Sequence, residues 1–560
     1  MTSQQLNELV AQTPKEPTRA PKPKEPTRAP KPKLEDFTEY SEEGAKTVHT
    51  DDFKQALSDW TEQEREYISN PQYISEKSST LKGIKSLFYE YRDLYLNEQK
   101  AKGGDIPKSV PPLETAKIIY KLLTVIKLDN EDGLLGVYNP ESGIYETSEK
   151  FFHRLIYWIE PTYSQARSKE VLFKLETLSE VKAQTTKPYL IPVANGIFNK
   201  KTQKLEPFSP RHIFTSTIAT KYNAQAKPPD IKGWNIDKWF SELMSNDNEL
   251  VQLLWEIISA STNGNYSYRK GVWFVGKGND GKGTVQSLIM NLIGRENVAS
   301  VKAEQFAERF ALSQVVGKTC IIGDDSQVNY LDNAGNYFSV ITGDPVPIEV
   351  KGKTPTLAIF NKLIIQSANF LPKFRNKSNG TYRRMLIVPF NKSYTAETDN
   401  WKIKDDYITR PEVLEYVLKK ALSLNFDRFI EPKVTQELLE EFKISNDTVL
   451  AFVSTDFQEF VSDFLPTTFI TAYYQAWCEV EGVKPFSKRE FELKLPDHIK
   501  DEWEKTTKRP HTAGFNRAVD LRHADELPKF RTLFYWSDEK HEKPTKGYLR
   551  AKKKQKNKKL

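Results

Sequence analysis

The chain has 560 residues, of which 38% are hydrophobic and 12% aromatic, and its formal net charge is +7. This length excludes a single small domain and favours about three or four domains, since a domain usually holds roughly 100–200 residues. The two cysteines, Cys320 and Cys478, are too few for a disulfide framework or a cysteine-based zinc site, and the modest charge permits a nucleic-acid partner without requiring one.

Hydropathy excludes a membrane protein at the level of sequence. No apolar run reaches the length of about 18 residues that a membrane-spanning helix needs. The N-terminus is polar and rich in proline, and it lacks the apolar core of a signal peptide. We therefore expect a soluble, intracellular protein with no membrane partner.

Residues 1–45 are predicted to form a tail without a core. The nine residues from Lys15 to Pro23 recur at once as residues 24–32, with three prolines in each copy and no bulky apolar residue. Such a segment favours a disordered or extended polyproline conformation. Two interpretations stay open: a basic spacer or docking peptide, and a solvated tail with no specific partner.

Residues 48–225 are predicted to form a mainly helical domain. Apolar residues recur at helical spacing from Ile118 through Ile126, and a strand-like run at Tyr189–Val193 precedes the turn signal Asn195-Gly196. This region shows no paired carboxylates of the kind that a metal-dependent primase centre needs, and no Cys/His cluster. We therefore expect that it does not make primers.

A glycine-rich loop stands between a predicted strand and a predicted helix. The apolar run Val272–Val275 precedes it, and apolar residues then recur on one helical face from Val285 until Gly294. This is the context of a P-loop, whose glycines let backbone N–H groups face phosphate oxygens at a helix N-terminus. The predicted nucleotide-binding residues are Gly276, Lys277, Gly278, Asn279, Asp280, Gly281, Lys282, Gly283 and Thr284.

Two positions of this loop carry distinct chemistry. Lys282 would place a full positive charge on the β- and γ-phosphates. The hydroxyl residue that usually follows this lysine is replaced by Gly283, so Thr284 is the expected hydroxyl ligand of Mg²⁺. The loop therefore predicts ATP and Mg²⁺ as cofactors, and the alternative is a glycine-rich turn that binds no nucleotide.

Acidic and amide side chains follow two further predicted strands. Thr319–Ile322 leads to Asp324 and Asp325, and Leu363–Ala368 leads to Asn369. Acids at the carboxyl end of a parallel strand lie where α/β folds bind ligands. We assign Asp324 to the metal, Asp325 to the attacking water, and Asn369 to the γ-phosphate or to positioning of that water.

An arginine pair precedes a fourth apolar run, Met385–Phe390. Arg383 or Arg384 could reach into the ATP site of a neighbouring subunit and stabilise charge in the transition state. The alternative is a surface pair beside a core strand.

A β-hairpin is predicted between the second and third strands. The runs Pro347–Val350 and Thr356–Ile359 surround a glycine, which is typical of a hairpin. Lys351 and Lys353 would lie at its tip, where lysine suits contact with a DNA backbone. The alternative is an ordinary exposed turn.

The order of these motifs resembles that of superfamily 3 helicases, and in detail the phage and plasmid primase–helicase family. Further matching segments are Leu190–Gly196, Ser209-Pro210, Thr342–Asp344 and Leu371–Arg375. The resemblance covers residues 110–395. It implies an AAA+-like ATPase that forms a hexameric ring, hydrolyses ATP at subunit interfaces and tracks one DNA strand in its pore, usually from 3′ to 5′.

The resemblance also assigns roles by position. It makes Lys351 and Lys353 the DNA contacts of the hairpin, Asn369 the sensor, and Arg384 or Arg383 the arginine finger. The chain departs from the family at Asp325, where glutamate is frequent, and near Asn376, where an acid is frequent. The first departure bears on activation of water.

A C-terminal DNA-binding module is predicted for residues 446–545. The missing primase domain makes the chain similar to self-contained replication initiators of phage satellites and staphylococcal mobile elements, in which a C-terminal winged helix binds the origin. Ser487 to Glu490 fits a capping box that opens a helix, with Lys488 and Arg489 as candidate major-groove contacts. A lid domain without base contacts is the alternative.

The sequence thus predicts a multidomain α/β protein. Its expected parts are a tail (1–45), a mainly helical domain (48–225), an ATPase domain with a parallel sheet (226–395), a helical connector (396–445), a winged-helix-like domain (446–545) and a basic tail (546–560). The leading hypothesis is an ATP-dependent replicative DNA helicase and initiator. It would act as a homo-hexamer on single-stranded and origin DNA, with host replication proteins as further partners, in the cytoplasm of a bacterial host.

Two alternatives stay open. One is a primase–helicase whose primase motifs are not recognised. The other is an initiator that binds origin DNA and uses ATP only as a switch, without separating strands.

Overall fold

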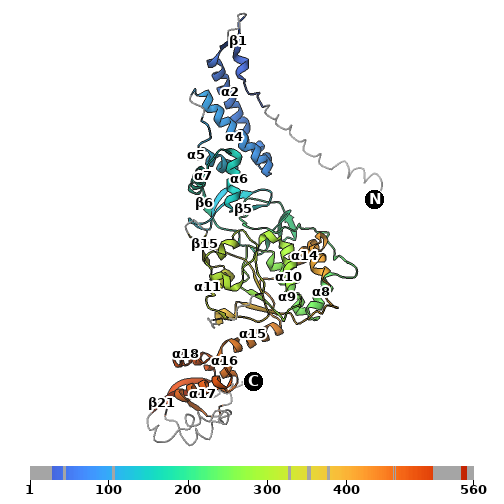
Figure 1. Cartoon of the computed structure of the whole chain (residues 1–560), viewed down its shortest axis with the longest axis vertical. Helices are drawn as coiled ribbons and strands as arrows, with labels where there is room; N and C mark the ends of the chain where they lie inside the picture. Colours follow the sequence, from blue (N-terminus) through green and yellow to red (C-terminus); the bar gives the residue numbers. More distant parts are fainter. Residues whose placement is uncertain are drawn as a thin grey trace, which may run out of the picture. The chain divides into compact units, whose positions relative to one another are not determined.

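The computed structural model describes residues 28–41, 46–103, 107–325, 330–349, 355–374, 379–457, 460, 462–508 and 544–551. The chain divides into two compact units (Figure 1). One comprises Met1–Thr124 and Glu149–Leu178, and the other comprises Val125–Ser148 and Ser179–Leu560.

The first unit is built mainly from helices, which confirms a helical N-terminal region. Its elements are η1 (Leu34–Phe37), β1 (Thr38–Tyr40), β2 (Lys46–Val48), α2 (Thr50–Ile68), α3 (Pro71–Lys77), α4 (Leu81–Ala101), α5 (Pro112–Leu122), α6 (Glu149–Ile159) and α7 (Gln165–Leu178). The side chains of Asn70 and Thr80 accept backbone hydrogen bonds at the starts of α3 and α4, so each helix begins at a capped position. Helices α2 and α4 pack side by side (Figure 1).

The predicted helical periodicity ends earlier than expected. Helix α5 ends at Leu122, and Leu123 already has an extended backbone, with φ −128° and ψ 147°. Ile126, which the helical spacing included, lies in strand β3 (Val125–Leu128). The β-branched pair Val125-Ile126 favours a strand, and burial on both faces hides the alternation that would have revealed it.

Two small sheets belong to the second unit. In the first, β3 lies between β4 (Leu135–Asn139) and β6 (Glu180–Lys182), and β5 (Ile144–Glu146) completes the order β5-β4-β3-β6. The second is an antiparallel meander of β7 (Leu190–Val193), β8 (Gly196–Asn199) and β9 (Lys204–Glu206). Only β7 was predicted, because strands this short carry little periodic signal.

A five-stranded parallel sheet forms the centre of the second unit, which confirms the predicted parallel sheet. Its order is β11-β12-β16-β10-β18. The strands are β10 (Gly271–Val275), β11 (Val298–Ala299), β12 (Cys320–Gly323), β16 (Ile364–Ala368) and β18 (Met385–Pro389). They are buried along almost their whole length, as strands covered on both faces are.

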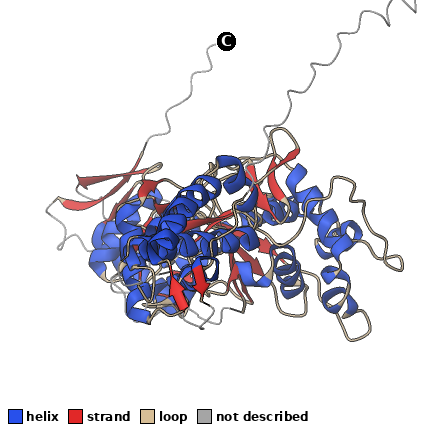
Figure 2. Ribbon diagram, turned by 90° about the horizontal axis from the view of Figure 1, so that it is seen from above, coloured by secondary structure: helices blue, strands red, loops and turns tan. Residues whose placement is uncertain are grey.

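Two hydrophobic cores lie on opposite faces of this sheet. Val272 and Phe274 of β10 belong to one core, and Trp273 belongs to the other, because successive side chains of a strand point to opposite faces. Figure 2 shows the mixed helix and strand content of the chain. The covering elements are α8 (Ile236–Leu243), α9 (Asn248–Ser261), α10 (Lys282–Ile293), α14 (Pro411–Ser423) and η5 (Tyr407–Thr409) with the first core, and η3 (Ala303–Ala307), η4 (Ala311–Val315), α11 (Gly335–Thr342) and α12 (Asn379–Tyr382) with the second.

The remaining elements of this region are short. They are η2 (Arg295–Asn297), β13 (Tyr330–Leu331), β14 (Pro345–Ile348), β15 (Thr356–Ile359), β17 (Lys373–Phe374), α13 (Lys402–Asp405) and α15 (Lys433–Asn446). Strands β14 and β15 pair antiparallel, so the predicted hairpin is confirmed in its strands.

The C-terminal region has a core of its own, rich in aromatic side chains. Its elements are α16 (Thr448–Ser454), β19 (Phe464–Pro466), α17 (Thr467–Val480), α18 (Lys488–Ile499), β20 (Trp503–Lys508) and β21 (Thr545–Arg550), with the antiparallel sheet order β19-β21-β20. Ser487 and Glu490 form the predicted capping box at the start of α18. Across the part of the chain that the structure describes, no helix combines the length and the apolar character needed to cross a bilayer.

Candidate nucleotide-binding site

The glycine-rich loop joins β10 to α10, as its sequence predicted. Gly278, Asn279 and Gly281 have φ values of 100°, 49° and 90°, in the left-handed region that favours glycine. A Cβ atom on Gly276 would lie 2.2 Å from Asp280 Oδ2 and 2.5 Å from the Phe390 carbonyl oxygen. The loop therefore depends on glycine both for its turn and for close backbone contact.

The carboxylate of Asp280 occupies the centre of this loop. It forms an ion pair with Lys282, and it accepts hydrogen bonds from the backbone N–H of Gly278 at 3.1 Å and of Lys282 at 3.2 Å. Lys282 Nζ also donates to the Gly276 carbonyl at 2.9 Å. Side-chain exposure is 9% for Lys282 and 4% for Asp280. Backbone N–H groups and an ammonium of this kind can bind an anion, and here the Asp280 carboxylate accepts from them.

Asp280→Asn is expected to tighten ATP binding by about tenfold, a difference of about 1.4 kcal/mol. Asparagine keeps an oxygen for the two backbone donors but removes the negative charge that competes with phosphates for Lys282. Titration of a fluorescent ATP analogue measures this change. Asp427→Asn is the matched control, because that carboxylate is exposed and lines neither cavity at the loop. Unchanged or weaker ATP binding by Asp280→Asn would show that the Asp280 carboxylate does not compete with the phosphates for Lys282.

One cavity brings together four of the residues predicted for ATP hydrolysis. Its volume is about 280 Å³. Lys282, Asp324, Asp325 and Asn369 all contribute to its wall. The other lining residues are Gly278, Asn279, Asp280, Gly283, Ser367 and Ala368. The acids and the amide follow the carboxyl ends of β12 and β16, which are neighbours in the parallel sheet, so their meeting follows from its topology.

Ser367 is a site residue that sequence reasoning missed. Its hydroxyl donates to Asp324 Oδ1 at 2.6 Å and accepts from the backbone N–H of Asp325 at 3.0 Å. Asp325 has a φ of 49°. Ser367 therefore fixes the turn that carries both acids. A hydroxyl within the buried strand β16 was the available signal, because buried polar groups need partners.

A second cavity, of about 470 Å³, lies on another side of the same loop. Thr284 lines this cavity, whereas Asp324 lines the first one, so the two predicted metal ligands do not share a cavity wall. Gly283 lines both cavities. A Cβ atom at this position would have open space around it, since no atom beyond its chain neighbours and its own helix backbone lies within 4 Å.

Four aromatic residues, Trp234, Trp239, Tyr394 and Trp401, line this second cavity. Trp234 Nε1 and Tyr394 Oη are buried polar atoms with no hydrogen-bond partner among the described residues. Asn279 holds Tyr394 in place, since its carbonyl accepts from the Tyr394 backbone N–H at 2.9 Å and its side chain donates to the Tyr394 carbonyl. Aromatic surface is suited to contact with a flat ligand.

The two arginines of the predicted pair differ in their surroundings. Arg384 is half-buried, donates from Nη1 to the Gly380 carbonyl at 2.9 Å, and lies over the Phe338 ring at 5.8 Å from its centroid. Arg383 is exposed. Neither lines the two cavities at the loop.

The predicted DNA contacts are only partly within the described structure. Lys351 and Lys353, at the hairpin tip, lie outside the described residues, as does Asn376. Lys488 and Arg489 are exposed at the start of α18, and Lys488 Nζ lies 4.0 Å from Glu492.

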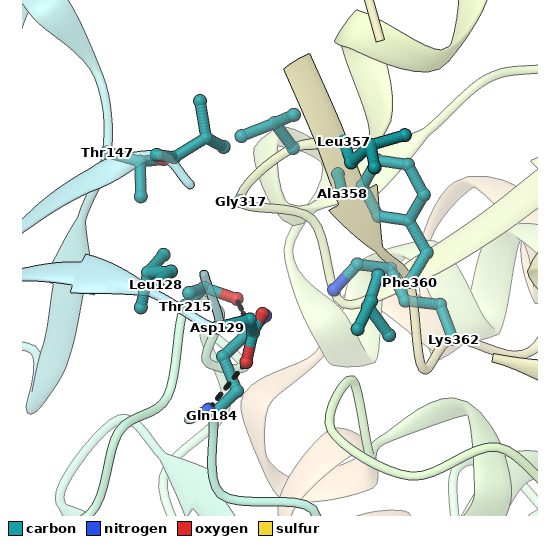
Figure 3. A pocket seen from close by; sticks show the side chains of 13 residues that line it. Leu128, Asp129, Thr147, Gln184, Thr215, Gly317, Leu357, Ala358, Phe360 and Lys362 are labelled. Atoms are coloured by element: carbon teal, nitrogen blue, oxygen red, sulfur yellow. Dashed lines mark hydrogen bonds between the residues drawn. The ribbon is translucent and has the colours of Figure 1, made fainter. Parts of the chain in front are cut away.

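A third, much smaller cavity lies in the second unit near Lys362 (Figure 3). On one wall Gln184 donates to Asp129 through its backbone N–H at 2.9 Å and its side chain at 2.7 Å, and it accepts from Thr215 at 3.0 Å. Lys362 approaches from the opposite wall and donates to the Gly264 carbonyl at 3.2 Å. The volume of about 30 Å³ suits a water molecule and excludes a nucleotide.

Lys362→Met is expected to change how stability depends on pH. Burial lowers the pKa of Lys362 to about 8, whereas an unfolded lysine titrates at about 10.4. Between these values the unfolded chain binds more protons, so the free energy of unfolding rises with pH there. The native lysine is therefore unfavourable below pH 8, by about 1.4 kcal/mol for each pH unit of the shift, and this cost disappears toward pH 10.

Melting temperatures of the native and Lys362→Met proteins, compared from pH 7 to pH 10, measure this effect. The variant should be more stable at pH 7, offset in part by the lost donor to Gly264, and should lose that advantage as the pH rises. Lys200, whose burial also lowers its pKa to about 8, is present in both proteins and cancels. A difference in melting temperature that does not change with pH would show that the pKa of Lys362 is not lowered in the folded protein.

Three family models match separate parts of the chain. They are "D5 N terminal like" over residues 82–240, a family of unknown function (DUF5906) over residues 274–384, and "Poxvirus D5 protein-like" over residues 444–528. The second segment holds the glycine-rich loop, the acid pair and the arginine pair.

A curated relative and two solved structures are also similar. "Putative helicase 121R" of Invertebrate iridescent virus 3 is 19% identical over 238 residues, which cover 40% of this chain and 25% of that protein. The apo structure of the NrS-1 C terminal region (305-718) is 10% identical, with a TM-score of 0.45, and covers 79% of this chain and 100% of that one. An A form apo structure of the NrS-1 C terminal region is 12% identical, with a TM-score of 0.43 and coverages of 72% and 98%.

The chain is thus similar to D5-type proteins in two segments, and it is also similar to a putative viral helicase. The chain spans only a quarter of the length of the curated relative, so the activity of that whole protein does not transfer directly.

Proposed function

We propose that this chain is an ATP-dependent replicative DNA helicase of the superfamily 3 type, and that it initiates replication of a mobile genetic element. One observation carries the proposal. Lys282, Asp324, Asp325 and Asn369 come from three separate segments of the sequence and line one cavity. That set contains a phosphate-binding lysine, two carboxylates and an amide, which are the groups that phosphoryl transfer to water requires.

In this proposal the glycine-rich loop is a P-loop. Its backbone N–H groups and Lys282 bind the β- and γ-phosphates after the Asp280 carboxylate has moved away from them. Asp325 deprotonates or orients the attacking water, and Asn369 holds that water or contacts the γ-phosphate. Ser367 positions both acids through its contacts with Asp324 and Asp325.

The donor set fits Mg²⁺. Asp324 is an exposed carboxylate at the wall of the first cavity, and Mg²⁺ in nucleotide sites usually takes one or two protein oxygens besides phosphates and water. Bound there, Mg²⁺ would neutralise charge on the phosphate oxygens. Thr284, in the second cavity, would contribute only if nucleotide binding drew its hydroxyl toward the phosphates.

The second cavity would receive the nucleoside. Its volume of about 470 Å³ and its four aromatic residues support this use. ATP would then extend from the second cavity across the loop into the first.

The proposal includes a homo-hexameric ring in the cytoplasm of a bacterial host. The hairpin lysines Lys351 and Lys353 would contact single-stranded DNA in the pore, and host replication proteins would be further partners. The C-terminal region would bind origin DNA as a winged helix, with Lys488 and Arg489 exposed at the start of α18.

Unwinding of a forked duplex tests the proposal, with Lys282→Ala as the blank. ATP-dependent strand release that the variant lacks would support a helicase, and reversing the single-stranded tails would give its polarity. Binding of DNA and turnover of ATP without strand release would contradict it and favour the ATP-switched initiator. Template-dependent incorporation of nucleotides would instead indicate a primase–helicase.

A further inference from the structure

The second copy of the nine-residue repeat ends in a segment that is docked on the first unit. The carbonyl of Ala29 accepts a hydrogen bond from Trp60 Nε1 at 3.1 Å, and Ala29 packs beside the Phe53, Leu57 and Trp60 cluster. Lys31 Nζ lies 3.1 Å from both carboxylate oxygens of Asp93. A segment predicted from sequence as part of a tail without a core thus has a defined site, between α2 and α4.

Arg28 makes the most specific contact of this segment. Its Nε and Nη2 donate to the two carboxylate oxygens of Glu64, at 3.2 Å and 2.5 Å, in a two-pronged arrangement. The side chain of Glu64 is only 3% exposed, and Glu90, 11% exposed, lies 4.0 Å from the same guanidinium. A buried carboxylate without a cation is unfavourable, and the planar guanidinium matches it better than an ammonium does.

The site therefore recognises a short sequence. We call the surface formed by Trp60, Glu64, Glu90 and Asp93 the α2–α4 groove. It binds the sequence Arg-Ala-Pro-Lys through the arginine side chain, the alanine carbonyl and the lysine side chain. Prolines within the segment favour the extended polyproline conformation in advance, which lowers the entropic cost of docking.

The first copy of the repeat carries the same ligand. Residues 15–23 are identical to residues 24–32, so Arg19, Ala20 and Lys22 correspond to Arg28, Ala29 and Lys31. We propose that the α2–α4 groove is a peptide-binding site and that it also binds residues 15–23 of a second copy of this chain.

The geometry favours exchange between chains. The second copy runs directly into η1, so it is the copy that its own groove holds. When the first copy occupies the groove of a neighbour, the neighbour's own segment leaves and an identical set of contacts replaces it. Exchange of identical elements is a low-cost route to association.

Peptide binding tests the groove. The full chain with Arg19→Ala and Arg28→Ala, in which neither own copy competes well, is titrated with a fluorescent peptide of residues 15–23. We expect saturable binding, weakened at least tenfold by Glu64→Gln in the protein or by alanine for arginine in the peptide. Glu66→Gln, an exposed position on the same helix, is the matched control. Absence of binding to the folded protein, or equal binding to Glu64→Gln, overturns the proposal.

Cross-linking then distinguishes a second chain from the same chain. One tagged chain carries Lys22→Cys, and a differently tagged chain carries Asp93→Cys with Arg28→Ala. The native Cys320 and Cys478 are buried, so the introduced cysteines are the reactive ones. A bismaleimide product between the two tags, suppressed by excess free peptide, supports exchange. A third protein carries Lys22→Cys, Asp93→Cys and Arg28→Ala on one chain. If only this protein is cross-linked, and only within the chain, the first copy binds the groove of its own chain, which overturns exchange. Because neither readout uses ATP, their failure and that of the proposed helicase are independent.

Discussion

Replacing Lys282 by alanine is expected to lower ATP hydrolysis by about 10²–10³-fold, the loss typical when one preorganised electrostatic group is removed. The ammonium of Lys282 contacts Asp280 and the Gly276 carbonyl, so it is held against the loop that would bind the phosphates. Its charge opposes the negative charge that builds up on the γ-phosphate during transfer. Steady-state phosphate release measures the rate, and nucleotide titration separates binding from chemistry.

A purely structural effect must be separated from this chemical one. Lys282→Ala leaves the Asp280 carboxylate, 4% exposed, without its cation, and that loss lowers the melting temperature as well. The double variant Asp280→Asn, Lys282→Ala removes the stranded charge. It should recover much of the melting temperature and none of the hydrolysis. Hydrolysis close to the native rate in the double variant would show that Lys282 is not the phosphate-binding lysine.

Four of the five strands of the central sheet were predictable because they are short, mainly apolar and bounded by polar residues or glycine. Val272–Val275 and Met385–Phe390 have this pattern, and β10 and β18 lie within one residue of those bounds. The candidate site was predictable for a related reason. Side chains that follow neighbouring parallel strands meet at one edge of the sheet, and Asp324 and Asn369 accordingly line the same cavity.

Contacts between distant side chains were not predictable from local pattern. The role of Ser367 depends on two acids in another segment, and docking of Arg28 depends on a carboxylate buried in α2. Composition described residues 24–32 as unable to build a core, which is true of the segment alone. Composition and periodicity describe only what a segment can bury by itself. They could not show that α2 and α4 supply a groove for it.

Arg383→Ala is expected to reduce ATP hydrolysis by about 10³–10⁵-fold, which is the contribution of an arginine finger. ATP binding and the melting temperature should stay unchanged. Arg383 is exposed, whereas Arg384 bonds to Gly380 and covers Phe338. Arg384→Ala should instead lower the melting temperature, because it removes the donor to the partly buried Gly380 carbonyl. ATPase assays and melting curves of both variants check this division of roles.

Mixing two inactive variants tests whether Arg383 acts on a neighbouring subunit. In a ring that contains Lys282→Ala and Arg383→Ala chains, some interfaces join a native Lys282 to a native Arg383. Those interfaces hold a complete set of groups, so the mixture should hydrolyse ATP although neither protein does so alone. Two arginines acting within their own chain cannot produce this result, because each chain would still lack one essential group. A mixture as inactive as its components would therefore contradict both the trans-acting Arg383 and the shared site that the proposed ring requires.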